Sequence, residues 1–131
     1  KVYKIFSNSL KNKLITFLGV TFKPNTDDMR EASSLYMIPK LLKKGAKINY
    51  FDPSGQKIEF KRFKNIKYCK NINQACLKSD LIILHTEWNE FKTLNFKKLI
   101  KKNNFIIFDM RNLYSPKLMK KKGINYLGIG R

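Results

Sequence analysis

Short apolar runs alternate along the chain with segments in which apolar residues recur every three or four positions. The runs are rich in β-branched and aromatic residues, which is typical of strands buried on both faces. Five strands are predicted on this basis, at Leu14–Gly19, Ala46–Phe51, Leu81–His85, Phe105–Asp109 and Asn125–Gly128. Short helices are predicted between the later strands, at Ile72–Lys78, Phe96–Lys101 and Ser115–Lys122.

A further helix is predicted between the first two strands. Ser33 and Ser34 are suitable caps for its beginning, and Gly45 is a suitable end because glycine readily adopts the left-handed conformation that closes many helices. Pro39 lies inside this helix and removes one backbone hydrogen bond. The apolar positions that share one face are Leu35, Ile38, Leu41 and Leu42.

Strands that alternate with helices in this way indicate a parallel sheet covered on both faces. We therefore expect a Rossmann-like α/β domain of about five strands at residues 13–131. Residues 1–12 are interpreted as the end of an interdomain helix, at Lys1–Phe6, and a linker. A helix that begins at the first residue without a cap suggests a cut through a longer protein. Ligands of such sheets bind beyond the carboxyl ends of the strands.

The composition is that of a folded domain. The chain has 131 residues and 43% of them are apolar, which excludes a disordered basic tail. The apolar runs are far shorter than the roughly 20 residues that a membrane span needs. Cys69 and Cys76 are too few for a disulfide framework and lack the spacing of a metal site, so we predict no metal ligands and expect a reducing cytoplasm.

The charge is large, since 28 Lys and Arg against 9 Asp and Glu give a formal net charge of +19. Such a charge can indicate binding to nucleic acid or membranes. However, lysine greatly outnumbers arginine and is scattered, whereas nucleic-acid surfaces favour arginine. We favour a solvated surface and expect neither nucleic acid nor membrane as a partner. A basic nucleic-acid-binding module and a non-catalytic interaction domain stay as alternatives.

The connection after the first predicted strand, residues 19–32, lacks the G-x-G-x-x-G pattern that cradles dinucleotide phosphates, since Gly19 is its only glycine. Asp52 stands where the ribose-binding acid of a dinucleotide site would be. Without the glycines, it is better interpreted as a turn residue before Pro53. We therefore do not expect this domain alone to bind NAD in the usual way.

Cationic side chains are predicted at the carboxyl edge of the sheet. Lys23 and Arg30 follow the first strand, and Arg111 follows the fourth. Together they could receive an anion at the usual ligand position of such sheets. They could equally form structural ion pairs, Arg30 with the pair Asp27–Asp28 and Arg111 with Asp109. Their spacing does not decide between the two interpretations.

Five separated motifs span nearly the whole chain in order. They are G-V-T-F-K-P-N-T-D-D-M-R-E-A-S-S-L at Gly19–Leu35, Y-F-D-P at Tyr50–Pro53, H-T-E-W-N-E-F at His85–Phe91, F-D-M-R-N at Phe108–Asn112 and Y-L-G-I-G-R at Tyr126–Arg131. Together they resemble the C-terminal UDP-binding domain of the UDP-glucose 6-dehydrogenases, in the UDP-glucose/GDP-mannose dehydrogenase family. Against the usual form of that family, Ser33 replaces a proline.

The resemblance implies a cytoplasmic homo-oligomeric enzyme that oxidises UDP-glucose to UDP-glucuronate with two NAD. Its NAD-binding domain and catalytic cysteine would lie in the rest of the same polypeptide, so this chain alone would be inactive and would hold no catalytic residue. Phe22, Lys23 and Arg111 are implied to bind the UDP-sugar, with Lys23 as a donor and Phe22 acting through its backbone. Arg30 is implied to reach the NAD cofactor. The nearest alternative is a dehydrogenase for another nucleotide sugar, GDP-mannose or UDP-N-acetylmannosamine.

Other conspicuous residues are given structural roles. His85 is the only histidine and has no Ser or Cys partner in its motif, so we do not expect it to act as a general base. Trp88 and Phe91 are expected to pack their loop onto the sheet. Cys76 falls on the apolar side of a predicted helix, which indicates a buried, inert thiol.

Overall fold

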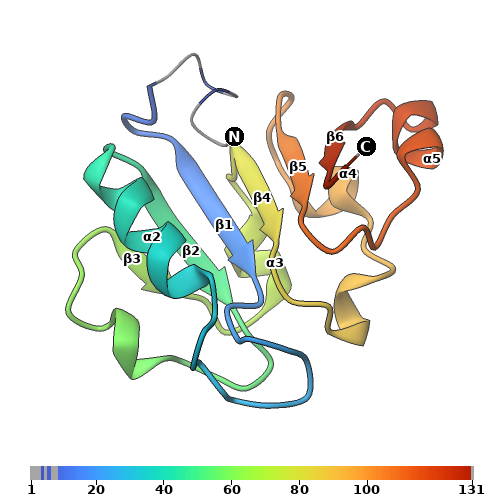
Figure 1. The fold of residues 1–131 in the computed structure, drawn as a ribbon. Helices are drawn as coiled ribbons and strands as arrows, with labels where there is room; N and C mark the ends of the chain where they lie inside the picture. Colours follow the sequence, from blue (N-terminus) through green and yellow to red (C-terminus); the bar gives the residue numbers. More distant parts are fainter. Residues whose placement is uncertain (1–3, 5, 7–8, 131) are drawn as a thin grey trace.

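A parallel sheet of six strands forms the centre of the protein (Figure 1). The computed structural model describes residues 4, 6 and 9–130, and the helix end predicted at Lys1–Phe6 falls largely outside them. The strand order is β3-β2-β1-β4-β5-β6, and all neighbours are parallel. The strands are β1 (Leu14–Leu18), β2 (Lys47–Phe51), β3 (Ile66–Tyr68), β4 (Leu81–Leu84), β5 (Ile106–Asp109) and β6 (Asn125–Gly128). The predicted Rossmann-like α/β fold is confirmed.

Strand β3 is the element that the sequence pattern missed. It has only three residues and lies at the edge of the sheet beside β2. The central residue, Lys67, is exposed, and its two apolar neighbours are only partly buried. An edge strand that buries so little has no continuous apolar run by which to recognise it.

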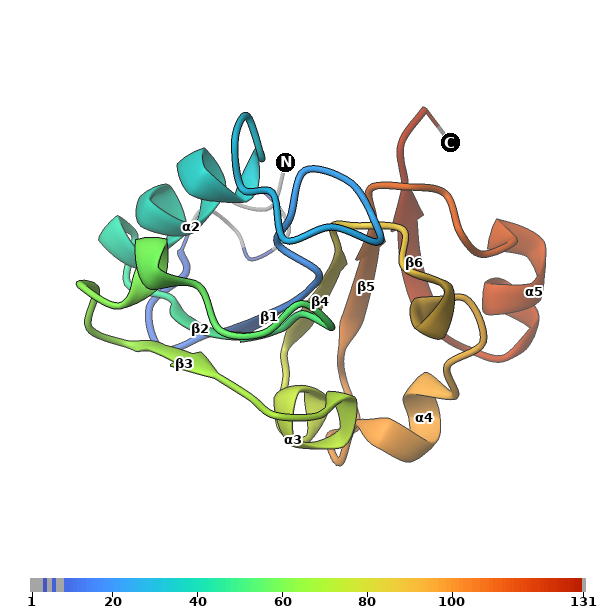
Figure 2. The ribbon, with the colours of Figure 1, turned by 90° about the horizontal axis from the view of Figure 1, so that it is seen from below.

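The helices lie on both sides of the sheet, as Figure 2 shows for α2 on one side and for α3 and α4 on the other. The helices are α2 (Ser34–Lys43), α3 (Ile72–Cys76), α4 (Phe96–Leu99) and α5 (Pro116–Lys121), with 3₁₀ turns η1 (Ile58–Phe60) and η2 (Asn89–Phe91). None of the helices among the described residues has the length and apolar character needed to cross a membrane.

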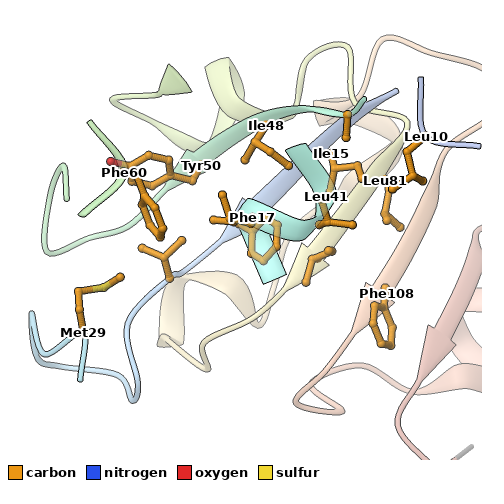
Figure 3. Packing of buried hydrophobic residues seen from close by; sticks show 14 residues of the cluster. Leu10, Ile15, Phe17, Met29, Leu41, Ile48, Tyr50, Phe60, Leu81 and Phe108 are labelled. Atoms are coloured by element: carbon orange, nitrogen blue, oxygen red, sulfur yellow. The ribbon is translucent and has the colours of Figure 1, made fainter. Parts of the chain in front are cut away.

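Two apolar clusters cover the two faces of the sheet. The first packs α2 and η1 against alternate residues of the strands, such as Phe17, Tyr50 and Ile83 (Figure 3). The second packs the other helices against the intervening residues. It includes Cys76, which is fully buried as predicted, and burial raises the pKa of this thiol to about 12. Trp88 and Phe91 also belong to the second cluster, which confirms their packing role.

The beginnings of the helices differ in how they are capped. Side-chain oxygens of Asn71, Asn95 and Ser115 accept hydrogen bonds from the backbone of α3, α4 and α5. The prediction that Ser33 and Ser34 cap α2 by their side chains is wrong. Ser33 occupies the N-cap position without a capping hydrogen bond, and the hydroxyl of Ser34 donates to the carbonyl of Val20 at 2.5 Å. The hydroxyl of Ser33 has a different partner, described below.

The register of the sheet sets the position of the loops at its carboxyl edge. Leu18 of β1 pairs with Leu84 of β4, which in turn pairs with Asp109 of β5. The three strands therefore end at the same level. The loops that follow β1, β4 and β5 leave the sheet side by side, and the crossovers from β1 and β4 diverge at this point, as expected for the ligand edge of a doubly wound sheet.

Candidate functional site

Gly19 brings the loop after β1 into contact with the loop after β4. Its N–H donates to the carbonyl of Phe51 at 2.8 Å, and its φ is +82°. A Cβ at this position would lie 2.6 Å from the Cβ of Thr86. Glycine is required here for two reasons, since side-chain-bearing residues disfavour this φ and no atom fits against Thr86.

Asp52 holds the first residues of the loop after β1. It is fully buried, and its Oδ2 accepts hydrogen bonds from the N–H groups of Val20 at 2.8 Å and Thr21 at 3.3 Å. Its Oδ1 accepts from the N–H and hydroxyl of Ser54, so it also forms the turn predicted before Pro53. The amides with which a dinucleotide-binding turn would hold a pyrophosphate are therefore occupied by a carboxylate.

The same loop exposes Phe22 and Lys23 at its tip. Phe22 is 45% exposed, and its N–H donates to the carbonyl of Asp28 at 3.0 Å, which closes the loop on itself. Met29 anchors the loop by inserting into the first apolar cluster. Lys23 is exposed, and its charge helps to lower the pKa of Asp28. The tip is thus held by its own backbone and leaves a lysine and an aromatic ring facing solvent.

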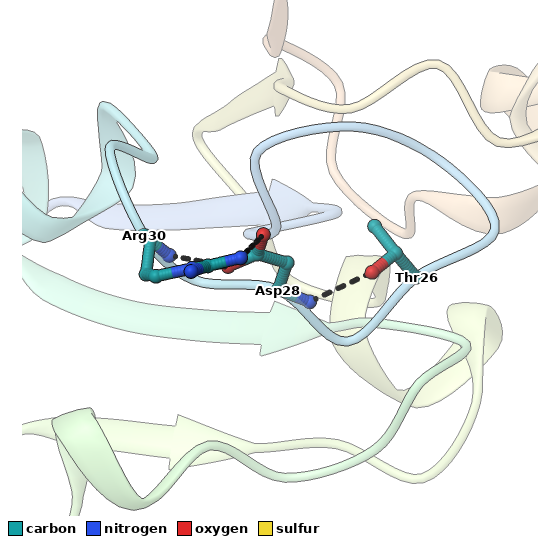
Figure 4. Close-up of polar contacts among 3 residues, drawn as sticks. All are labelled: Thr26, Asp28 and Arg30. Atoms are coloured by element: carbon teal, nitrogen blue, oxygen red, sulfur yellow. Dashed lines mark hydrogen bonds and ion pairs between the residues drawn. The ribbon is translucent and has the colours of Figure 1, made fainter.

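Arg30 forms an ion pair with Asp28, one of the two aspartates, Asp27 and Asp28, that the sequence offered as partners. Its Nε donates to Oδ1 of Asp28 at 3.1 Å, and its Nη2 donates to Oδ2 at 3.0 Å (Figure 4). The N–H of Asp28 in turn donates to the Thr26 hydroxyl at 3.1 Å. The hydrogen bond and charge of Arg30 lower the pKa of Asp28. The side chain of Arg30 is nonetheless 89% exposed, so the pair is weak and open to competition.

His85 is fully buried at the end of β4, and its ring contacts two hydroxyl groups. Nε2 lies 2.8 Å from the hydroxyl of Ser33, and Nδ1 lies 3.0 Å from the hydroxyl of Thr86. The Thr86 hydroxyl in turn donates to the carbonyl of Thr21 at 2.8 Å. The motif of His85 contains no serine, and the serine that contacts the ring, Ser33, comes from a segment 52 positions away.

Arg111 is held by the backbone of His85. Its Nε donates to the His85 carbonyl at 2.8 Å. The ion pair with Asp109 that the sequence allowed does not form between these two described side chains, because backbone and hydroxyl donors take the carboxylate. Oδ1 of Asp109 accepts from the N–H of Arg111 at 3.1 Å, and Oδ2 accepts from the N–H of Tyr114 and the hydroxyl of Tyr126. Arg111 itself is exposed at the edge of the sheet.

These contacts connect the three loops that the sheet places side by side. Thr86 binds the loop that carries Lys23, and His85 binds the loop that carries Arg111. Lys23, Phe22 and Arg111 therefore lie on adjoining loops at the carboxyl edge, with Arg30 on the same loop as Lys23. No group of three or more His, Cys, Asp or Glu side chains that could hold a metal occurs in the described part of the chain.

The roles of Asp52, Ser33 and His85 were not found from the sequence. Asp52 and His85 directly follow apolar runs that become strands and are fully buried, whereas Ser33 is exposed. For the two buried residues that placement is a usable signal, since a polar side chain at a buried position needs a partner. The partner itself lies 52 positions away for His85 and 32 for Asp52, beyond any local pattern.

Comparison with known proteins agrees with this description. Residues 16–116 match the model of the UDP-glucose/GDP-mannose dehydrogenase family, UDP binding domain. The chain is 36% identical over 134 residues to a UDP-glucose 6-dehydrogenase of Rickettsia prowazekii, covering 99% of this chain and 31% of that protein. A solved NDP-N-acetyl-D-galactosaminuronic acid dehydrogenase of Methanosarcina mazei superposes with a TM-score of 0.82 at 25% identity, covering 98% of this chain and 27% of that one. The chain thus spans about three tenths of the length of its curated relatives.

Replacing Gly19 by Ala is expected to lower the free energy of unfolding by about 2–5 kcal/mol, because the left-handed strain adds to the overlap with Thr86. Gly55 is a matched control, since its φ is +100° but no atom lies within 4 Å of the position that a Cβ would take. Gly55→Ala should lower the free energy of unfolding by about 1–2 kcal/mol, because only the left-handed strain contributes there. Urea unfolding measures both, and equal losses would contradict the close approach to Thr86.

Acid is expected to destabilise the fold through His85. Burial, reinforced by the charge of Arg111, lowers its pKa from 6.5 to about 4. Below pH 6.5 His85 is protonated in the unfolded chain but stays neutral in the folded chain until the pH approaches 4. The free energy of unfolding should therefore fall by about 2 kcal/mol between pH 7 and pH 5. Urea unfolding at both pH values tests this.

His85→Gln supplies the control for this titration because His85 is the only histidine. The variant should lack the loss between pH 7 and pH 5. The histidine Hε1 resonance of the unmodified chain reports the same pKa directly. A midpoint near the ordinary value would show that His85 is not buried as described.

Proposed function

Because the chain belongs to the UDP-glucose/GDP-mannose dehydrogenase family, we propose that residues 13–131 form the nucleotide-sugar-binding domain of a UDP-glucose 6-dehydrogenase. In this proposal residues 1–12 comprise the end of an interdomain helix and a linker to the rest of the polypeptide. The whole enzyme oxidises UDP-glucose to UDP-glucuronate with NAD, acts as a homo-oligomer and resides in the cytoplasm. Its catalytic residues come from outside this chain, so the chain alone binds substrate without turning it over.

The observation that carries the proposal is the pair of cations on adjoining loops. Arg111 is anchored through Nε to a carbonyl, a neutral partner, so its full charge remains available. Its terminal nitrogens are the planar donors that suit a phosphate. Lys23 stands exposed on the neighbouring loop. A diphosphate that lies along this edge would meet both charges, which is the chemistry that UDP requires.

Phe22 can contact the ligand through its backbone carbonyl and its ring, but not through its backbone N–H. Its N–H is used inside the loop, by the carbonyl of Asp28. The carbonyl of Phe22 is the backbone group that can accept from a sugar hydroxyl or the uracil N–H. The exposed ring offers in addition an apolar surface beside Lys23. We propose both contacts for the UDP-sugar.

NAD does not fit this chain as a complete site. The amides of Val20 and Thr21 are satisfied by Asp52, so the turn after β1 has no cradle for a pyrophosphate. We propose that the rest of the polypeptide holds the cofactor and that Arg30 reaches it across the cleft between that part and this domain. Its exposed guanidinium can exchange the weak pairing with Asp28 for a cofactor group.

A different nucleotide sugar is the second candidate. The structural similarity to a dehydrogenase named for NDP-N-acetyl-D-galactosaminuronic acid favours it, since the carboxyl edge described here would serve any nucleoside diphosphate sugar. The sugar would also contact residues beyond this chain, so the choice of sugar is partly set there. Assay of the complete enzyme with UDP-glucose, UDP-N-acetylmannosamine and GDP-mannose separates these substrates, and the first is expected to be preferred.

Lys23→Ala and Arg111→Ala are each expected to weaken UDP binding to this chain by about 1.5–3 kcal/mol, the size of a hydrogen bond to a charged group. Isothermal titration calorimetry measures the loss. Lys78→Ala is the control, because Lys78 is equally exposed but follows α3 on the way to the opposite end of β4. If both edge variants bind UDP as tightly as the unmodified chain, the proposed site is wrong.

Arg30→Ala is expected to raise the KM for NAD about tenfold, as for one lost charged hydrogen bond, while the KM for UDP-glucose stays within twofold. The assay uses an enzyme in which this chain replaces the C-terminal part of the Rickettsia prowazekii relative. Arg62→Ala serves as the matched control, because Arg62 also rests on a side chain of its own loop, 4.7 Å from the ring of Phe63. An unchanged KM for NAD would remove Arg30 from the cofactor site.

A further inference from the structure

Ser33 is the exception among the helix caps of this protein. The cap residues of α3, α4 and α5 give their side-chain oxygens to the helix that they begin. Ser33 instead directs its hydroxyl to Nε2 of His85 at 2.8 Å, and α2 has no side-chain cap. The hydroxyl that could cap α2 is therefore bound to His85 instead.

The protons in this network can be assigned from its chemistry. A carbonyl can only accept, so the hydroxyl of Thr86 must give its proton to the carbonyl of Thr21. Nδ1 of His85 must then carry a proton and donate to Thr86. In the neutral ring Nε2 is left with a lone pair, and it accepts from Ser33. The hydrogen bonds therefore run in one direction, from Ser33 through His85 and Thr86 to Thr21.

This chain of hydrogen bonds closes the base of the substrate loop. Thr21 stands at the beginning of the loop that carries Lys23, and Ser33 stands at its end. The hydroxyl of Thr86 binds Thr21 and the imidazole of His85 binds Ser33, so both ends of the loop are tied to two adjacent residues after β4. The backbone of the same histidine accepts from Nε of Arg111 at 2.8 Å. One residue thus contacts all the loops that carry the proposed substrate ligands.

We propose that His85, held in its Nδ1–H form by Ser33 and Thr86, is a positioning residue that sets the distance between Lys23 and Arg111. The inference rests on the proposed function, since it is UDP that would span the two cations. His85 touches neither substrate nor cofactor in this proposal and acts only through the loops.

The surroundings of the ring require it to be neutral. His85 is fully buried, and Arg111 is the charged group beside it. A second proton would place a buried cation near that arginine and would turn Nε2 from an acceptor into a donor, which reverses the bond to Ser33. A neutral imidazole can donate on one side and accept on the other, which is what a link between two hydroxyl groups needs.

Ser33→Ala tests the inference, with Ser33→Thr as the conservative variant that keeps the hydroxyl. NMR of this chain observes the ring nitrogens of His85, the Nε–H of Arg111 and the amide exchange of Phe22, whose N–H donates to the Asp28 carbonyl within the loop. We expect a protonated Nδ1 and a bare Nε2 in the unmodified chain. Ser33→Ala should shift the Arg111 signal and speed exchange at Phe22, and Ser33→Thr should restore both.

UDP affinity is the second measurement. Ser33→Ala should weaken UDP binding about fivefold, as for one lost hydrogen bond, although Ser33 itself does not contact the nucleotide. Ser79→Ala is the matched control. It removes a different hydroxyl contact, a buried one in which the Ser79 hydroxyl lies 2.5 Å from that of Thr16, just before β4 and away from the loops. It should cost stability and leave UDP affinity unchanged.

The outcomes separate this inference from the proposed function. A proton on Nε2, or unchanged Arg111 and Phe22 signals in Ser33→Ala, overturns the positioning role whether or not UDP binds. Failure of the unmodified chain to bind UDP overturns its function in substrate binding, while the NMR signals still decide the role of His85. Equal loss of UDP affinity in Ser33→Ala and Ser79→Ala would show a general effect of stability and would also reject the inference.

Discussion

The absence of a side chain at Gly19 is the constraint on which the rest of the site depends. A Cβ there would lie 2.6 Å from that of Thr86, so only glycine lets the loops after β1 and β4 meet where their crossovers diverge. The contact brings Thr86 within hydrogen-bond distance of the carbonyl of Thr21. From there the connection continues through His85 to Arg111. The close approach of the two loops thereby sets the relative position of the segments that carry Lys23 and Arg111.

Two buried carboxylates near the site, both within the described residues, bind backbone and hydroxyl groups and form no ion pair with Arg111. Asp52 and Asp109 are buried and accept hydrogen bonds from backbone amides and hydroxyl groups. Arg111 is anchored on a carbonyl instead of a carboxylate, which holds its position without neutralising it. The formal charge of +19 is spread over the whole surface, whereas the edge of the sheet arranges a few cations around one place. The proposed diphosphate site rests on that arrangement and not on the overall charge of the surface.

The sequence was sufficient for the elements that bury continuous apolar runs. Strands such as β1 and β4 were predicted to within a residue or two because each buries nearly every position. The short edge strand β3 was missed because it buries little. The positions of Lys23 and Arg111 at one edge followed from the topology. The bond between Ser33 and His85 could not be predicted, because it joins residues 52 positions apart and competes with an equally good local use of Ser33 as a cap.

The central claim is that loops from β1, β4 and β5 form one binding edge for a nucleoside diphosphate. Titration of the ¹⁵N-labelled chain with UDP, followed by the backbone amide resonances, tests it most directly. The account predicts saturable shifts confined to residues 19–33, 85–88 and 110–114. Shifts centred on the cavity at the opposite edge, which is lined by Lys13, Asp80 and Lys102 among others, would contradict it. So would the absence of any saturable shift.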